Sequence, residues 1–142
     1  MIVVVSTAKR TLEMQLLIGP HDAVPVAGRF SYRSDRPYEV EVDFITRGRS
    51  VATWLFARDL LLGGLRDETG EGDVRVWPFR EPGGQRRIHI ELSTDDSVCE
   101  LSARATELTA WLEQTAAIVP PGREDEYLDI DTHLARLLAG KH

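Results

Sequence analysis

The sequence contains a single cysteine, Cys99, among its 142 residues, and it has no long apolar run. One cysteine allows neither an internal disulfide framework nor a cysteine-rich zinc site, so we interpret Cys99 as a small buried hydrophobe. No stretch approaches the ~18 apolar residues that a membrane span requires. The apolar start, Met1 to Val5, is too short for a signal-peptide core. We therefore expect a cytoplasmic protein that contacts a membrane only through its partners.

Recognisable motifs of catalysis and ligand binding are also missing. The histidines (His21, His89, His133 and His142) do not stand at a metal-ligand spacing from one another or from a cysteine. No serine occupies a nucleophile elbow, and Cys99 has no histidine at a recognisable spacing. The sequence thus predicts a protein that is not an enzyme and has no catalytic residues, no cofactor and no metal site.

Basic residues are too few for a general nucleic-acid surface. The 17 Lys and Arg against 23 Asp and Glu give a net charge of −6, whereas phosphate binding needs clustered cations. The length and the hydrophobic content of 42% suit one folded domain over residues 1–142 with one core.

Most of the chain alternates apolar and polar residues, which is typical of half-buried strands. The pattern predicts four strands before a short helix and three after it, hence an α+β fold with two antiparallel sheets. The seven expected strands cover residues 11–18, 26–33, 38–46, 51–56, 73–79, 86–93 and 97–101.

The stretch Val51–Leu65 joins the fourth strand directly to the short helix. Both faces of this strand carry bulky residues, so we expect it to be covered on both sides, with Trp54 in the core. The period then changes to helical spacing at Leu61, and Gly63-Gly64 weakens the helix near its end.

A long helix over residues 103–118 is expected next, with Ser102 as its cap. Trp111, beside its apolar stripe, is interpreted as core or subunit interface. A last helix, with Leu134, Leu137 and Leu138 on its inner face, should close the chain. Upstream, the acidic row Glu39, Glu41 and Asp43 is too widely spaced for one metal ion, so we expect a solvated face or pairs with Arg29 and Arg33.

The run from Trp54 to Pro78, WLFARDLLLGGLRDETGEGDVRVWP, resembles the signature region of the SsgA-like family. The resemblance extends through Ile88–Leu92, the helix around Trp111, Val119-Pro120-Pro121-Gly122 and the closing Leu128-Asp129-Ile130-Asp131. FARDLL followed by GDVRVWP is a specific pair of motifs. These proteins act in sporulation and cell division of filamentous, spore-forming actinobacteria.

The resemblance implies a fold similar to the whirly single-strand nucleic-acid-binding proteins, assembled as a bell-shaped homo-oligomer, a trimer. It implies a non-enzymatic regulator that controls septum-site localisation and assembly during sporulation. Such a regulator would be recruited to division septa and would bring or regulate the tubulin-like protein FtsZ.

Four residues are candidates for partner contact: Arg58, Asp59, Arg75 and Trp77. For Arg58 and Asp59 a structural role is the alternative, in which Asp59 favours the start of the short helix and Arg58 pairs with Glu41 or Asp43. A different function, single-stranded nucleic-acid binding, would use an aromatic and cationic groove of Arg75, Trp77, Phe79, Arg80, Arg86 and Arg87. For Trp77 and Phe79 we favour packing between sheet and helix.

Overall fold

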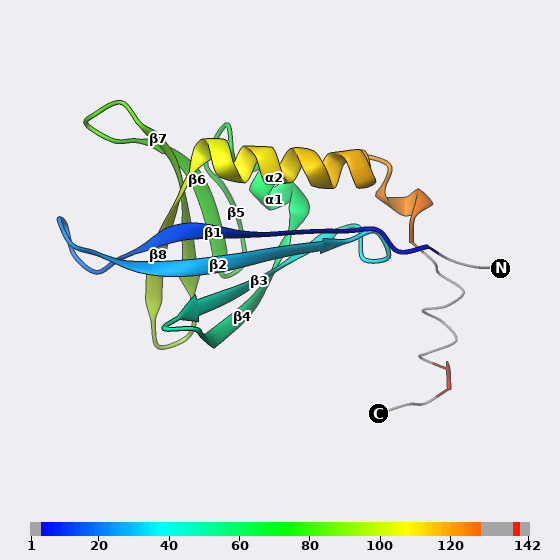
Figure 1. Ribbon diagram of the computed structural model, residues 1–142, viewed down its shortest axis with the longest axis horizontal. Coiled ribbons are helices and arrows are strands. Elements are labelled where there is room, and N and C mark those ends of the chain that lie inside the picture. Colours follow the sequence, from blue (N-terminus) through cyan, green and yellow to red (C-terminus); the bar gives the residue numbers. More distant parts are fainter. Residues whose placement is uncertain (1–3, 129–137, 140–142) are drawn as a thin grey trace.

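Eight strands form one antiparallel sheet in the computed structural model, which describes residues 4–128 and 138–139 (Figure 1). The order across the sheet is β4-β3-β2-β1-β8-β7-β6-β5. The strands are β1 (Thr7–Leu17), β2 (Ala23–Arg33), β3 (Glu39–Thr46), β4 (Arg49–Ala57), β5 (Thr69–Glu71), β6 (Val74–Arg80), β7 (Arg86–Ser93) and β8 (Val98–Arg104). The helices are α1 (Arg58–Gly64), α2 (Ala105–Ile118) and the short 3-10 turn η1 (Glu124–Glu126).

The expected division into two sheets is wrong, because β1 pairs with β2 on one side and with β8 on the other. β1 pairs with β2 along its whole length, but only Met14–Leu17 pair with β8. The two halves therefore diverge, and in Figure 1 strands β6 to β8 run across the direction of β1 and β2. The predicted strands are otherwise confirmed, and the structure adds the short strand β5, which the sequence pattern did not predict.

The core lies between the diverging halves, where α2 packs on β1, β7 and β8. Trp111 is fully buried there, with its ring edge-on to Phe30 at 5.3 Å between centroids. Its indole N–H donates to the carbonyl of Ala8 at 3.3 Å. The interpretation of Trp111 as a core residue is thus confirmed. Truncating an aromatic side chain of this kind typically costs ~3–5 kcal/mol.

β4 is an edge strand covered on one face only, so the expectation of cover on both faces is wrong. Phe56 is buried and Trp54 is half-buried against the core, whereas Val51 and Leu55 on the other face are 62% and 55% exposed. Sequence alternation gave the two faces of this strand correctly. Bulk on both faces did not mean burial on both, because an apolar side chain can also mark an open surface.

The short helix α1 ends where its backbone approaches β6. A Cβ atom on Gly64 would overlap the side chain of Val76. This glycine is therefore needed for close packing of α1 on β6, in addition to weakening the helix as the sequence predicted. Within the described residues, no helix is long and apolar enough to cross a membrane.

Other local expectations have mixed outcomes. α2 begins at Ala105 without a side-chain cap, and Ser102 lies buried in β8, so the predicted capping role of Ser102 is wrong. Asp43 accepts a hydrogen bond from Arg29 at 2.8 Å, as predicted, but Arg33 pairs with Asp35. The expected last helix falls mostly on residues 129–137, outside the described part of the chain.

Candidate functional site

Arg58, the first residue of α1, is fully buried and bonded to the end of α2 and to η1. Its guanidinium donates to the carbonyls of Thr115 and Val119 at 3.2 and 2.7 Å, and to a carboxylate oxygen of Glu124 at 2.9 Å. It also lies over the ring of Tyr32, 4.8 Å from the centroid. Arg58 thus neutralises carbonyls at the negative end of α2 and fixes the chain that follows.

Glu124, the partner of Arg58, is itself almost fully buried. Burial alone would raise the pKa of its carboxyl, but the hydrogen bond from Arg58 and backbone N–H donors outweigh burial, and the net pKa is lowered. One of these donors is the N–H of Gly122, at 2.8 Å. Burial likewise raises the pKa of Tyr32 to about 12, although Arg58 opposes that shift.

These contacts correct the predicted pairing of Arg58 with Glu41 or Asp43, and they favour the structural interpretation of Arg58. Asp59 lies in the first turn of α1 and is exposed, and its side chain makes no capping hydrogen bond. Whether Asp59 contacts a partner stays a prediction.

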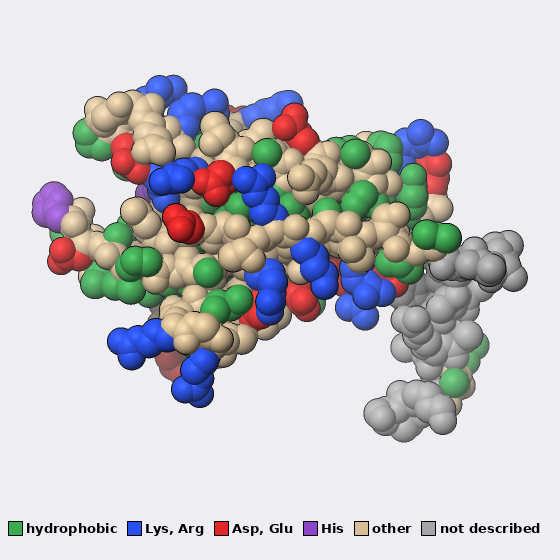
Figure 2. All heavy atoms as spheres, viewed as in Figure 1, with side chains coloured by type: hydrophobic (Ala, Val, Ile, Leu, Met, Phe, Trp, Pro, Cys, Tyr) green, Lys and Arg blue, Asp and Glu red, His purple; other side chains and the backbone are tan. Residues whose placement is uncertain are grey.

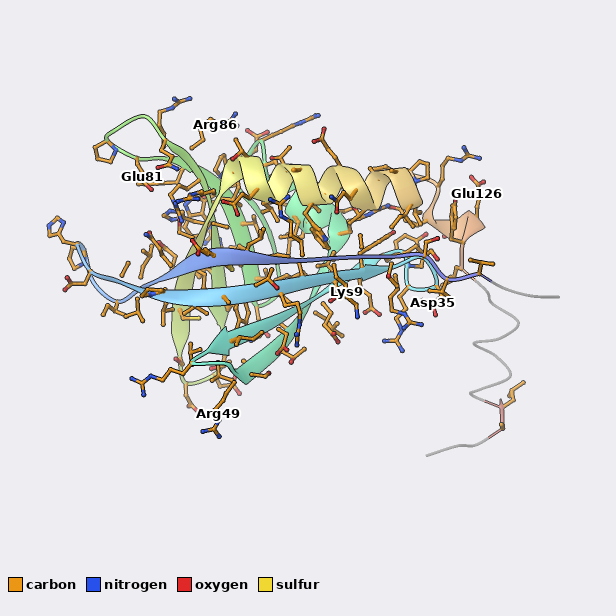
Figure 3. The ribbon with its side chains drawn as sticks, viewed as in Figure 1. Lys9, Asp35, Arg49, Glu81, Arg86 and Glu126 are labelled. Atoms are coloured by element: carbon orange, nitrogen blue, oxygen red, sulfur yellow. The ribbon has the colours of Figure 1, made fainter. Side chains whose placement is uncertain are left out.

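The other two candidates lie on the outer face of the sheet, away from the helices. Arg75 is exposed on β6 and pairs with Glu68. Trp77 is half-buried and lines a groove of about 850 Å³, to which residues of the β1–β2 and β6–β7 hairpins also contribute. Figure 1 shows these two hairpins at the same end of the molecule. Figure 3 places Glu81 and Arg86 at the β6–β7 hairpin, and Glu81 lines the groove.

The floor of the groove is aromatic. His89 on β7 lies between the rings of Trp77 and Phe79, at 5.7 and 4.4 Å between centroids, and it stacks on Phe79. Packing of Trp77 and Phe79 between sheet and helix, which we favoured, is therefore wrong. The alternation of β6 separated its two faces correctly, but it did not show which face the helices would cover.

His89 lies on the outer side of the sheet, on the same face as Trp77 and Phe79. It is nevertheless only 6% exposed, because the aromatic rings cover it. Burial lowers the pKa of its imidazole, against the opposing effect of Glu100, whose carboxylate lies 3.1 Å from Nδ1. Sequence reasoning missed His89 as a member of this site, because the burial comes from across-strand neighbours.

Charges around the groove are mostly paired. Arg87 donates through Nε to the hydroxyl of Ser102 at 2.6 Å and lies 3.3 Å from Glu81. Of the described residues that line the groove, Asp22, Glu81 and Glu100 are acidic, His21 and His89 are histidines, and Arg87 is permanently cationic. Carboxylates therefore outnumber the guanidinium three to one among these residues.

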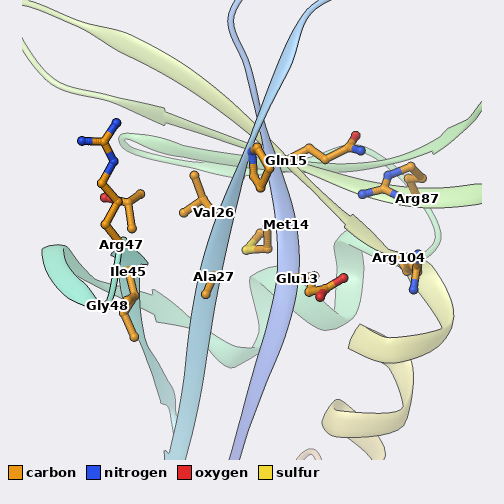
Figure 4. Close-up of a pocket in the computed structure, with 12 residues that line it drawn as sticks. Glu13, Met14, Gln15, Val26, Ala27, Ile45, Arg47, Gly48, Arg87 and Arg104 are labelled. Carbon is orange, nitrogen blue, oxygen red and sulfur yellow. The ribbon is translucent and has the colours of Figure 1, made fainter.

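A second hollow of about 580 Å³ adjoins the groove and shares Gln15 and Arg87 with it. Figure 4 shows Arg104 and Glu13 beside β1 and Arg47 at the β3–β4 hairpin on the far side of β2. Arg104 is paired with Glu107 at 3.2 Å. On the face that Figure 2 shows, acidic and basic side chains are interspersed and do not form a continuous cationic stripe.

The chain is similar in sequence to a family of known proteins. Residues 26–124 match the family described as Streptomyces sporulation and cell division protein, SsgA. The sporulation-specific cell division protein SsgB of Streptomyces coelicolor is 39% identical over 134 residues, which is 94% of this chain and 97% of that protein. SsgB of Thermobifida fusca is 36% identical over 126 residues, covering 89% and 91% of the two chains.

Solved structures agree with the sequence relation. A structure of SsgB, reported with mutations that correlate to longitudinal cell division during sporulation of Streptomyces coelicolor, has a TM-score of 0.82 at 37% identity. It covers 87% of this chain and 97% of that one. The SsgA-like sporulation-specific cell division protein of Thermobifida fusca has a TM-score of 0.84 at 34% identity over 96% and 98% of the two chains. The chain therefore belongs to the SsgA family of sporulation and cell-division proteins.

Proposed function

We propose that the protein is a non-enzymatic regulator of sporulation-specific cell division that determines where septa assemble. The observation that carries the proposal is the relation to proteins named SsgB over nearly the whole chain, at 39% identity and with matching architecture. The site supports it, because the described residues on the outer face form an aromatic groove suited to binding.

The division protein that we propose as a partner is FtsZ. A protein that positions septa must act on the machinery that builds them, and the family resemblance points to this tubulin-like protein. The test is to image a fluorescent fusion of the protein together with labelled FtsZ during sporulation. We expect both at the same septal positions, with FtsZ rings reduced or misplaced when the gene is deleted. Unchanged FtsZ rings in the deletion strain would overturn the FtsZ mechanism.

We further propose that the protein works as a homo-oligomer, a bell-shaped trimer with the whirly-like arrangement. The exposed apolar side chains of Val51 and Leu55 on the edge strand, and of Val98 at the start of β8, supply surface for such contacts. A specific interface should bury ~1,000 Å² or more. Light scattering tests this, since a mass near 15.9 kDa at every micromolar concentration would contradict assembly.

Single-stranded nucleic-acid binding is the alternative function, and the exposure of Phe79 on the outer face is the observation that favours it. Aromatic platforms of this kind stack bases when cations flank them. Arg75 and Arg87, however, are paired with Glu68 and Glu81. We therefore expect a fluorescence titration with single-stranded DNA to give no micromolar binding, whereas such binding with a steep negative salt slope would reverse the ranking.

A further inference from the structure

The outer groove combines an aromatic floor with more carboxylates than guanidinium groups among its described lining residues. Glu100 uses one oxygen toward Nδ1 of His89, and its side chain is 34% exposed. Trp77 lies next to the same imidazole, 5.7 Å between centroids. An indole face and a carboxylate held by a shared neighbour form the two halves of a site for an organic cation.

We propose that the groove binds a cationic side chain, arginine in the best case, on an extended segment of the protein's division partner. The proposal deepens the proposed function and rests on it, because it names the chemistry of the partner segment. The cation would lie against the ring of Trp77 and pair with Glu100, with Glu81 at the hairpin wall as a second carboxylate. A guanidinium fits better than an ammonium, since it both stacks on an aromatic plane and bonds a carboxylate through two donors.

Charge complementarity selects this occupant over an anionic one. In the part of the chain that the structure describes, three carboxylates and one guanidinium line the groove, and that guanidinium, on Arg87, is already bonded to Ser102 and Glu81. A phosphate backbone would meet these carboxylates without free cations to replace its counterions. The adjoining hollow has Arg47, Arg87 and Arg104 against Glu13, so an isolated cation fits the surface better than a polycationic tract.

The experiment uses the indole N–H of Trp77 as a reporter in two-dimensional ¹⁵N NMR of the purified protein, assigned by its loss in Trp77→Leu. The probe is a blocked Gly-Ser-Arg-Ser-Gly peptide at constant ionic strength. The matched control peptide carries citrulline, the neutral isostere of arginine, in place of the arginine. We expect a saturable shift with a Kd on the order of 50 mM for arginine, from one cation–π contact and one exposed ion pair, and a much smaller shift for citrulline.

Two variants distinguish binding of the arginine peptide in the groove from general attraction of a cation to an acidic protein. Glu100→Gln should weaken binding about fivefold, the value of one exposed ion pair. Glu113→Gln on the exposed side of α2 removes the same charge on the other side of the sheet and should leave the Kd unchanged. Both variants must show the wild-type NMR spectrum away from the substitution, which controls for folding.

Equal shifts for the arginine and citrulline peptides, equal weakening by both variants, or no saturable shift would each overturn the proposal. A Trp77 shift with oligothymidylate and none with the arginine peptide would also overturn it, in favour of nucleic-acid binding. Because this measurement involves no septation readout, its failure leaves the proposed cellular role standing. Failure of that role, with the arginine site intact, would show in the imaging experiment instead.

Discussion

Replacing Arg58 with methionine should strongly destabilise the fold without touching any exposed surface. Methionine retains most of the apolar length of arginine but removes the guanidinium. The change leaves the Glu124 carboxylate buried with backbone N–H groups, that of Gly122 among them, as its remaining donors. It also removes the hydrogen bond to the carbonyl of Val119. The carbonyl of Thr115 keeps its bond from the N–H of Val119.

The expected loss follows from these contacts. Removing one partner of a buried ion pair typically costs ~3–5 kcal/mol, because the other charge stays buried without compensation. Domains of this kind are stable by only ~5–15 kcal/mol. Arg58→Met should therefore lose about a fifth or more of the free energy of unfolding. The double variant Arg58→Met/Glu124→Gln should recover part of it, because no buried charge remains. The coupling energy between the two sites should exceed ~1 kcal/mol.

The coupling energy is measured by urea unfolding, followed by tryptophan fluorescence, of the wild type, Arg58→Met, Glu124→Gln and the double variant. Arg123→Met is the matched control, because Arg123 and Glu126 form an ion pair of 2.7 Å with both side chains more than half exposed. It should leave the unfolding midpoint unchanged. Loss of less than ~1 kcal/mol in Arg58→Met, or additive single effects, would refute the assignment of Arg58 as the buried tie between α1, α2 and η1.

The pH dependence gives an internal check. The pKa of Glu124 in the folded protein lies below its ordinary value of 4.5, so the ion pair contributes stability above that value and loses it as the pH falls through the folded pKa. The difference in stability between the wild type and Arg58→Met should accordingly shrink in acid. A difference that stays constant would contradict the contribution of the Glu124 charge.

Four further outcomes are expected. Trp54→Ala should fold but lose about 2–3 kcal/mol in urea unfolding, less than a fully buried aromatic residue, and a loss under ~1 kcal/mol would place the side chain at the surface. Asp59→Ala should lose no more than ~1 kcal/mol, the helix-dipole contribution, so normal stability with lost partner binding would identify Asp59 as a contact residue. Gly64→Ala should destabilise by about 1–3 kcal/mol through overpacking against β6, whereas a stabilised variant would contradict the close approach. Burial lowers the pKa of His89 from 6.5, so the free energy of unfolding should fall as the pH drops below about 6.5. His89→Gln should make this dependence on pH weaker. The same dependence in both proteins would refute the burial of a neutral imidazole.

The sequence predicted the elements of this fold better than their arrangement. Alternation placed β7 correctly at residues 86–93 and identified the two faces of β4 and β6. It could not show that β1 pairs with β8, because pairing between distant strands leaves no local periodicity. The two-sheet expectation was the direct consequence of that missing contact.

In the candidate site, too, the sequence identified individual residues but not their contacts. FARDLL marked Arg58 as a notable residue, but its partner Glu124 lies 66 positions away, beyond the end of α2. Trp77 was identified, whereas His89 was not, because its burial depends on rings contributed by the neighbouring strand. Local pattern thus reveals which residues are unusual, and tertiary contacts decide what they do.

The measurement that tests the central claim most directly is the number and spacing of septa in sporulating cells that lack the gene, counted by membrane staining. The deletion strain should be complemented with the wild-type gene and, separately, with an empty vector. We expect sporulation septa to be absent, sparse or misplaced without the gene, and regular spacing to return with the wild-type copy. Normal septation in the deletion strain would contradict a role in sporulation-specific cell division.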